Sequence, residues 1–237
     1  MDPNRKIAII VGVLFIAATV AGIISVVFGP NLDAPDYLAN LSANKNQALI
    51  GGFFEFTMAV LIVGIPIFMY PILKKYNEAL ALGYVVFRTI EVVFFTVCAI
   101  SLLTLLTLSQ EFVIAGAPDA SYFQTLATLL LAVREWGGGV FSTIVFSISA
   151  LMLNYILYRS KLIPRWLSGW GLIGATLYLG SGFLPLIGHG SRSTIYLLME
   201  APLGLNEMVF AVWLIVKGFN SDAIVSGSAK KDTNEVK

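Results

Sequence analysis

Seven ionisable side chains interrupt the long apolar runs of this 237-residue sequence, and their types and spacing could support binding chemistry. If those runs lie in a membrane, a charge at a helix centre costs about 2.5 to 3.5 kcal/mol. Such residues therefore usually face a protein interior or a water-filled cavity. The candidate ligand-binding residues are Arg88, Glu91, Glu207, Glu200, Glu55, Arg134 and Glu135.

Spacing places several of these residues on shared helix faces. Arg88 and Glu91 are three apart, and Glu200 and Glu207 are seven apart, so each pair lies on one face of a helix. If the faces meet, five carboxylates share two guanidiniums, and two carboxylates can pair with arginine. The rest must be protonated, hydrated or neutralised by a cation, because uncompensated buried charge is not tolerated.

Two explanations of the Arg88 and Glu91 pair stay open. The first is a structural ion pair that fixes helix packing, with Glu207 as a further partner. The second is a polar cavity open to the outer side, which accepts a cation, a proton or a polar small molecule.

Metal binding, nucleophilic catalysis and nucleic-acid binding have less support, because the sequence lacks most of the residues that each would need. The sequence has one histidine, His189, and one cysteine, Cys98, so we expect no metal site, no disulfide and no cofactor. The intramembrane serines have no histidine on an apolar run to activate them. A net charge of +1 leaves no basic stripe for nucleic acid. An intramembrane enzyme with Glu91 or Glu207 as general base is therefore the least supported hypothesis.

The apolar runs that carry these residues predict an all-α, polytopic transmembrane bundle of about six spans. The sequence is 57% hydrophobic and 12% charged, whereas soluble domains carry about 25% charged residues. Lipid-exposed backbone must pair within its own segment, and no run shows the alternation of a barrel strand, so the spans are helices. The predicted spans are Ile7–Phe28, Leu49–Leu73, Ala79–Leu108, Trp136–Tyr158, Trp166–Ile187 and Thr194–Val216.

The first span could instead be a signal peptide, because Arg5 and Lys6 precede it. Its apolar run exceeds the 7 to 15 residues, roughly, of a signal-peptide core, which favours a retained span.

Lysine and arginine fall on one set of loops, and short cytoplasmic loops collect them. Both termini are therefore predicted to be cytoplasmic. Residues 1–219 form the six-span domain, and residues 220–237 are expected to form a flexible cytoplasmic tail. The residues on this side are Arg5, Lys6, Lys74, Lys75, Arg159, Lys161, Arg165, Lys217, Lys230 and Lys231. The opposite loops carry Asp33, Asp36, Glu111 and Asp119, with Lys45 and Arg192.

Two outer segments are less regular. Gly29–Gln47, with its prolines and polar residues, is predicted to be an outer connection. Ser121–Val133 is either an outer interfacial helix or the first turns of an unusually long fourth span that runs through Gly137, Gly138 and Gly139.

Three spaced motifs resemble a known family. They are the run from Ser160 to Leu167 and on to Gly171, the cluster of Phe87, Arg88 and Glu91, and the ending from Glu207 to Phe219. Together they resemble the prokaryotic membrane proteins of domain of unknown function 4386, and the resemblance extends from Arg5 to Phe219. It implies a multi-span membrane protein of a bacterium or archaeon, and no activity. Relatives often carry a histidine where this chain has Gly137 to Gly139.

Three functional hypotheses follow. The first is a small transporter or ligand-binding membrane protein that uses the acidic cavity, with a small polar ligand, proton or cation as its partner. The second is a structural or assembly partner in a membrane complex, and the third is an intramembrane enzyme. The expected location is the cell membrane, with the lipid bilayer as the surrounding partner and the oligomeric state left open.

Overall fold

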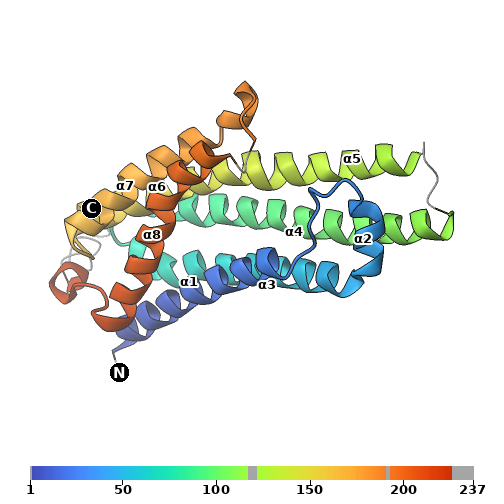
Figure 1. The fold of residues 1–237 in the computed structure, drawn as a ribbon. Coiled ribbons are helices and arrows are strands. Elements are labelled where there is room, and N and C mark those ends of the chain that lie inside the picture. The colour runs from blue at the N-terminus through green and yellow to red at the C-terminus, as the bar shows by residue number, and fades with distance from the viewer. Residues whose placement is uncertain (1, 117–121, 191–192, 226–237) are drawn as a thin grey trace.

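The protein is a bundle of long helices (Figure 1). This computed structural model describes residues 2–116, 122–190 and 193–225, and no strand occurs within those ranges. Six helical segments in it are long and apolar enough to cross a membrane, which confirms the predicted architecture. They are α1 (Pro3–Val27), α3 (Lys45–Leu73), α4 (Glu78–Ile114), the continuous α5–η1–α6 segment (Tyr122–Ser160), α7 (Arg165–Ser181) with η2 (Leu184–Ile187), and α8 (Thr194–Val216).

Local capping fixes where several of these helices begin and end. Asn77 accepts a hydrogen bond from Leu80 N at 3.0 Å at the start of α4, and Ser193 accepts one from Tyr196 N at 3.4 Å at the start of α8. These side chains satisfy amide groups that have no partner within the helix. At the end of α6, Lys161 has a φ of 57°. This left-handed conformation commonly terminates a helix.

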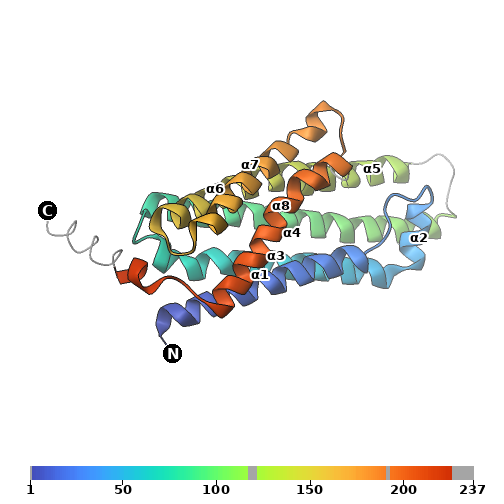
Figure 2. The same cartoon turned by 60° about the vertical axis from the view of Figure 1, so that its left-hand side comes forward.

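The spanning helices form a closed ring at one end of the molecule. Each helix packs against the next in the order α1, α3, α4, α6, α7 and α8, and α8 packs against α1, which closes the ring (Figures 1 and 2). A large apolar core fills this end of the ring, so the interior is closed there. Its buried residues include Phe15, Ile65, Met69, Ile72, Leu73, Tyr84, Ile156, Leu157, Leu162, Leu167, Phe210 and Leu214.

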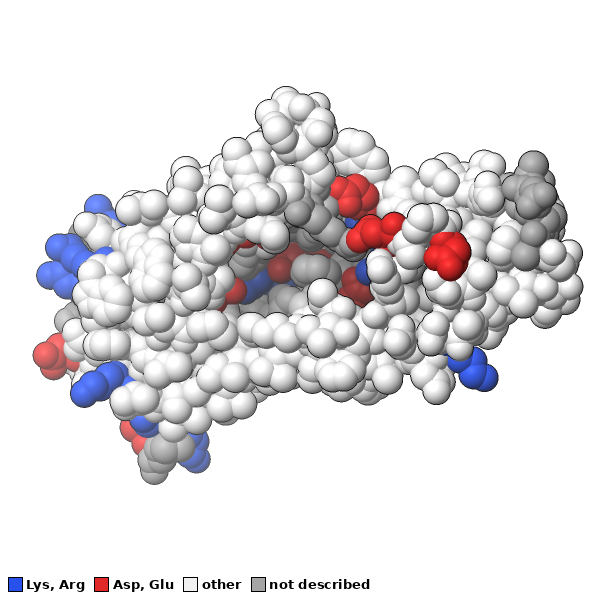
Figure 3. Space-filling model, viewed as in Figure 1, with Lys and Arg blue, Asp and Glu red and all other residues white. Residues whose placement is uncertain are grey.

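We call the closed end the basic end, because it carries Arg5, Lys74, Arg159, Arg165 and Lys217 where α1 begins and α8 ends. Figure 3 shows lysine and arginine gathered at this end of the molecule. This is the end that the sequence predicts to be cytoplasmic, and that orientation stays a prediction. Four of the residues used for that prediction, Asp119, Arg192, Lys230 and Lys231, lie outside the described residues.

The opposite end of the bundle extends past the end of α1. The 37 residues of α4 span about 55 Å, against about 30 Å for a hydrocarbon core. A methyl group on Gly51 would lie 3.1 Å from Gly29 Cα and 3.5 Å from the Leu102 side chain, so α1 ends level with these residues. Beyond that level a second apolar core forms among α2 (Tyr37–Ala43), α3, α4 and α5.

This second core changes the prediction for Gly29–Gln47. The segment is not simply a connection, because it contains α2, whose Leu38 and Leu41 are buried. The two leucines are three residues apart and therefore lie on one helix face, which packs against α4.

The structure decides between the two alternatives for Ser121–Val133, of which Ser121 lies outside the described residues. α5 (Tyr122–Arg134) runs directly into η1 (Glu135–Phe141) and then α6 (Ser142–Ser160). The segment is therefore the first part of a long fourth helix, and not a separate interfacial helix.

Most of the segment predicted as a flexible tail, residues 226–237, lies outside the described residues. The preceding residues pack against the basic end. Asn220 N donates to Leu162 O at 2.9 Å, and Tyr76 Oη donates to Ala223 O at 2.8 Å. Residues 220–225 are thus held by the helical bundle.

Candidate functional site

A charged triad joins α4 and α8 within the bundle. Arg88 Nη1 lies 2.8 Å from Glu91 Oε2, and Arg88 Nη2 lies 3.2 Å from Glu207 Oε1. The side chains of Arg88 and Glu91 are each 4% exposed, whereas that of Glu207 is 22% exposed. One guanidinium is therefore shared by two carboxylates, and Glu207 is the least buried member of the triad.

The surroundings of the triad combine apolar packing with unused hydrogen-bonding capacity. The Arg88 guanidinium lies over the Phe146 ring of α6, with its Cζ 4.6 Å from the ring centroid. Tyr84, one turn before Arg88, is fully buried. Its hydroxyl and Arg88 Nε make no hydrogen bond with any residue that the structure describes. Buried polar atoms are usually satisfied, so these two donors could serve a bound molecule or water.

A second ion pair connects α3 with the end of α5. Arg134 Nη1 lies 3.1 Å from Glu55 Oε2 and also donates to the Cys98 carbonyl oxygen of α4. Cys98 Sγ in turn lies 3.7 Å from Arg134 O. These contacts tie three helices together at a level different from that of the triad.

The π-helix η1 begins directly after Arg134. Such widened turns often occur at functional sites, because they interrupt the regular backbone pattern. The close approach of η1 to α4 depends on glycine. A methyl group on Gly137 or Gly138 would lie 3.3 Å from Cys98 Sγ, which is tighter than ordinary van der Waals contact.

Glu200 and Glu135 belong to neither ion pair. Ser181 Oγ donates to Glu200 Oε1 at 3.5 Å, and the hydroxyls of Tyr178 and Tyr196 also interact with this carboxylate. Glu135 is exposed at the first residue of η1. The predicted group of seven residues is thus distributed over separate places in the bundle.

Depth separates the two ion-paired clusters. Counted along its helix from the basic end, Arg88 lies about 15 Å deep and Glu91 about 20 Å, whereas Glu55 lies about 27 Å deep. Glu55 and Arg134 line a cavity of about 680 Å³ between α1, α3 and α4, together with polar residues such as Ser25 and Asn31. Figure 3 shows a hollow in this face of the molecule with acidic and basic atoms inside it.

Pairing in the bundle differs from the sequence-based expectation in one respect. Within the described part of the chain, three carboxylates form ion pairs with the two arginines, where the sequence suggested two. They are those of Glu91, Glu207 and Glu55. The difference arises because Arg88 presents two nitrogens to different helices. Sequence reasoning also missed Tyr84 and Phe146, although Tyr84 could have been noticed from its spacing of four residues from Arg88.

Comparisons with known proteins give a family but no activity. The family model described as "Domain of unknown function (DUF4386)" matches residues 10–218. An "Uncharacterized protein" of Archaeoglobus fulgidus is 29% identical over 83 residues, which are 35% of this chain and 48% of the relative. The chain thus spans about half the length of this curated relative. No solved structure matches the chain.

Proposed function

This chain belongs to the family of domain of unknown function DUF4386, and from its charged interior we propose a ligand-binding function. The protein is an integral membrane protein. In our proposal it binds a small cation, or a proton, in an intramembrane cavity around Arg88, Glu91 and Glu207, as a small transporter would.

One observation carries the proposal, and it is the excess of carboxylates in the triad. Arg88 can neutralise one of the two carboxylates that contact it, so the triad has a formal charge of −1 when both are ionised. At this depth an uncompensated charge is costly. A bound cation or proton would remove the excess, and it would bind on Glu207, the less buried of the two carboxylates.

The shape of the bundle supports access from one side. The apolar core closes the basic end below the triad, whereas the cavity lined by Glu55 and Arg134 lies toward the opposite end. A solute would therefore approach from the opposite end and meet Glu55 and Arg134 before Glu207. The buried Tyr84 hydroxyl, one turn from Arg88, would add a neutral donor beside the triad.

Thermal unfolding of the purified protein in detergent tests the proposal. Unfolding is scanned against pH and against a panel of monovalent cations, divalent cations and small organic amines. A ligand that binds only the folded state stabilises it by about 2.7 kcal/mol at a hundredfold excess over Kd. We expect a shift in the wild-type Tm that is lost in Glu207→Gln, which keeps the size of the side chain and one acceptor.

Glu111→Gln is the matched control, because Glu111 is exposed near the end of α4 and lies far from the triad in sequence. It should keep the wild-type shift. If neither pH nor any compound moves the wild-type Tm differently from that of Glu207→Gln, the binding proposal fails. The triad is then a structural device that fixes α8 against α4.

A further inference from the structure

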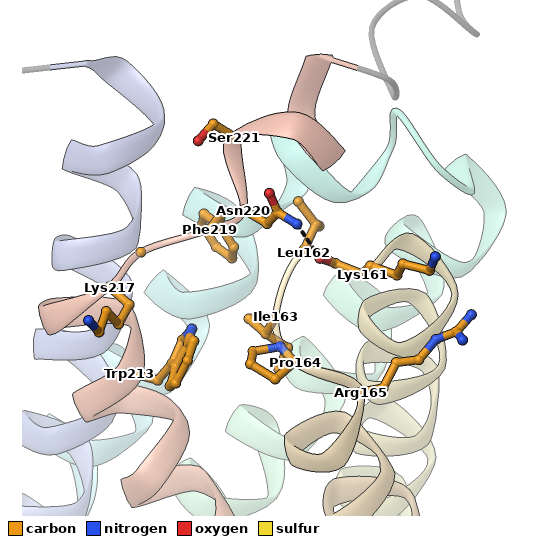
Figure 4. A pocket seen from close by; sticks show the side chains of 11 residues that line it. Lys161, Leu162, Ile163, Pro164, Arg165, Trp213, Lys217, Phe219, Asn220 and Ser221 are labelled. Carbon is orange, nitrogen blue, oxygen red and sulfur yellow. Dashed lines mark hydrogen bonds between the residues drawn. The ribbon is translucent and has the colours of Figure 1, made fainter.

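Two cavities of similar size differ in whether their charged side chains converge. The first, of about 560 Å³, lies at the basic end between the turn that joins α6 to α7 and the segment after α8 (Figure 4). Figure 4 shows Lys161 and Arg165 pointing away from it on one side and Lys217 on the other. Arg165 instead lies over the Tyr158 ring, with its Cζ 5.3 Å from the ring centroid. The charged side chains of this cavity therefore do not converge on a ligand.

The second cavity is the one of about 680 Å³ that Glu55 and Arg134 line, and there two opposite charges meet. Arg134 Nη1 lies 3.1 Å from Glu55 Oε2, and no other described residue that lines this cavity is charged. The lining is therefore formally neutral. An ion of a single sign would add an uncompensated charge to this largely buried site, which is costly, whereas a zwitterion would add none.

The ion pair leaves hydrogen-bonding capacity on both of its partners. Arg134 uses Nη1 for Glu55 and for the Cys98 carbonyl oxygen, whereas its Nη2 and Nε donate to no residue in the described part of the chain. Glu55 accepts from Arg134 through Oε2, which leaves Oε1 for another donor. Arg134 lines the cavity, and its side chain is 23% exposed. Two neighbouring guanidinium nitrogens bind a carboxylate through two parallel hydrogen bonds.

The end of α1 adds partial negative charge to the same cavity. α1 ends at Val27, and Ser25, Val26 and Val27 line the cavity. Within the described ranges, no backbone amide donates to the carbonyl oxygens of these three residues. The last carbonyl groups of a helix carry the negative end of its dipole, which favours a cation nearby. The cavity thus combines acceptors for an ammonium group, from Glu55 and α1, with donors for a carboxylate, from Arg134.

Much of the remaining lining is apolar. Leu32, Met58, Phe95 and Leu102 line the cavity from the segment after α1, from α3 and from α4. Small-molecule sites typically have volumes of about 300 to 1,000 Å³ and apolar walls with a few polar groups that fix orientation. The charged end of a ligand must be compact, because the Glu55 carboxylate and the Arg134 guanidinium are in contact. These features fit a molecule with adjacent ammonium and carboxylate groups and an apolar side group.

We propose that this cavity binds an α-amino acid with an apolar side group, in its zwitterionic form. The carboxylate binds the Nε and Nη2 edge of Arg134. The ammonium group binds Glu55 Oε1 and the carbonyl oxygens at the end of α1, and the side group lies against Met58 and Phe95. This site is separate from the charged triad, and binding there does not depend on the cation or proton proposed for Glu207.

Equilibrium binding of radiolabelled L-leucine to the purified full chain in detergent tests the proposal. Three competitors each remove one feature of leucine: 3-methylbutylamine lacks the carboxylate, 4-methylpentanoate lacks the ammonium group, and glycine lacks the apolar side group. We expect saturable leucine binding. Loss of either charge should weaken binding about 10- to 100-fold, and loss of the side group about tenfold. Phosphoethanolamine, whose charges are further apart, represents a lipid headgroup and should also bind more weakly than leucine.

Two substitutions test the assigned contacts while the Glu55 ion pair is kept. Arg134→Lys keeps the positive charge but loses the second nitrogen, and should weaken leucine binding about 10- to 100-fold. Arg159→Lys is its matched control, because Arg159 is exposed and does not line the cavity. Phe95→Ala should weaken binding of leucine more than that of glycine. Phe53→Ala, at a 64% exposed position outside the cavity, should change neither.

Several results would overturn the proposal. Leucine binding that does not saturate is one. If 3-methylbutylamine binds as tightly as leucine, the cavity accepts simple cations, and if 4-methylpentanoate does so, it accepts simple anions. Phosphoethanolamine binding as tightly as leucine would favour a lipid headgroup. Leucine binding that is unchanged in both Arg134→Lys and Phe95→Ala would place the amino acid elsewhere in the protein.

Discussion

Arg88 shows how one side chain connects two helices that are far apart in the sequence. Its contact with Glu91 follows from a spacing of three residues and could be predicted without a structure. Its contact with Glu207 joins residues 119 positions apart and depends on how α8 packs. No local pattern contains that information. For the same reason the sequence suggested one group of seven residues, whereas the bundle separates them by depth.

Exchanging the two charged residues of α4 tests how much the contact between Arg88 and Glu207 contributes to stability. The variant Arg88→Glu with Glu91→Arg keeps an ion pair on one face but moves the guanidinium away from Glu207. We expect a lower Tm than wild type, because two carboxylates would then face each other without a cation between them. Adding Glu207→Gln to the exchanged protein should recover part of the loss. An exchanged protein as stable as wild type would show that Glu207 does not depend on Arg88.

At the scale of the helices, close packing between the first and last spans depends on one glycine. A methyl group on Gly12 of α1 would lie 2.6 Å from Ala211 O and 2.7 Å from Ile215 Cγ1 of α8. Small residues allow helix backbones to approach in membranes, where apolar surfaces alone provide no preference for association. The position of such a residue can be proposed from sequence, but its partner cannot.

Substitution of Gly12 should therefore weaken the ring. We expect Gly12→Ala to destabilise the protein by about 1 to 3 kcal/mol through overpacking. Gly204→Ala is the matched control on α8, because nothing lies within 4 Å of a methyl group there. It should be neutral or stabilise the helix by about 0.5 to 1 kcal/mol. Thermal unfolding in detergent compares the two, and an equal effect of both variants would contradict the packing argument.

The segment after α8 depends on Tyr76 between α3 and α4. Its hydroxyl donates to Ala223 O, and Tyr76→Phe removes that bond at a cost of about 1 kcal/mol. Limited proteolysis should then cut faster at residues 221–225. Tyr70→Phe is the control, because the Tyr70 hydroxyl contacts Glu78 and not this segment.

The same contact predicts how protection of the segment depends on pH. Burial raises the pKa of Tyr76 from 10.0 to about 12. A group whose pKa is higher in the folded than in the unfolded protein stabilises the folded state fully at pH values below the unfolded-state pKa. That stabilisation is lost as the pH rises through the folded-state pKa. Protection by this bond should therefore be constant from about pH 6 to pH 9, and it should fall only between 10 and 12. A loss of protection below pH 9 in wild type but not in Tyr76→Phe would contradict this role.

At the scale of the whole molecule, apolar run length predicted the number of spans because each crossing needs about 20 apolar residues. The same criterion could not predict how far α4 and α5 continue, since their apolar residues serve the second core around Leu38 and Leu105 instead of lipid. The predicted fourth span already included Gly137 to Gly139, but the criterion left open whether the helix began before them. There the backbone adopts a π-helix rather than ending, in contact with Cys98.

The orientation of the bundle is tested by labelling intact cells. In a Cys98→Ala background, Asp36→Cys should react with a membrane-impermeant thiol reagent added outside, because Asp36 is exposed beside α2 at the end opposite the basic end. Lys6→Cys should react only after the cells are permeabilised. Wild-type Cys98 is 2% exposed and should not react in either case. The reverse pattern would place the termini outside.

The contact of Arg5 with the last turn of α8 has a consequence for biogenesis. The chain is inserted from its N-terminus, so α1 enters the membrane long before the carbonyl groups of Leu214 and Ile215 have been synthesised. Until then Arg5 and the surface around Gly12 lack their final partner, although α1 can already pack against α3. The ring therefore closes as a late step of membrane insertion, when the last helix docks on the first.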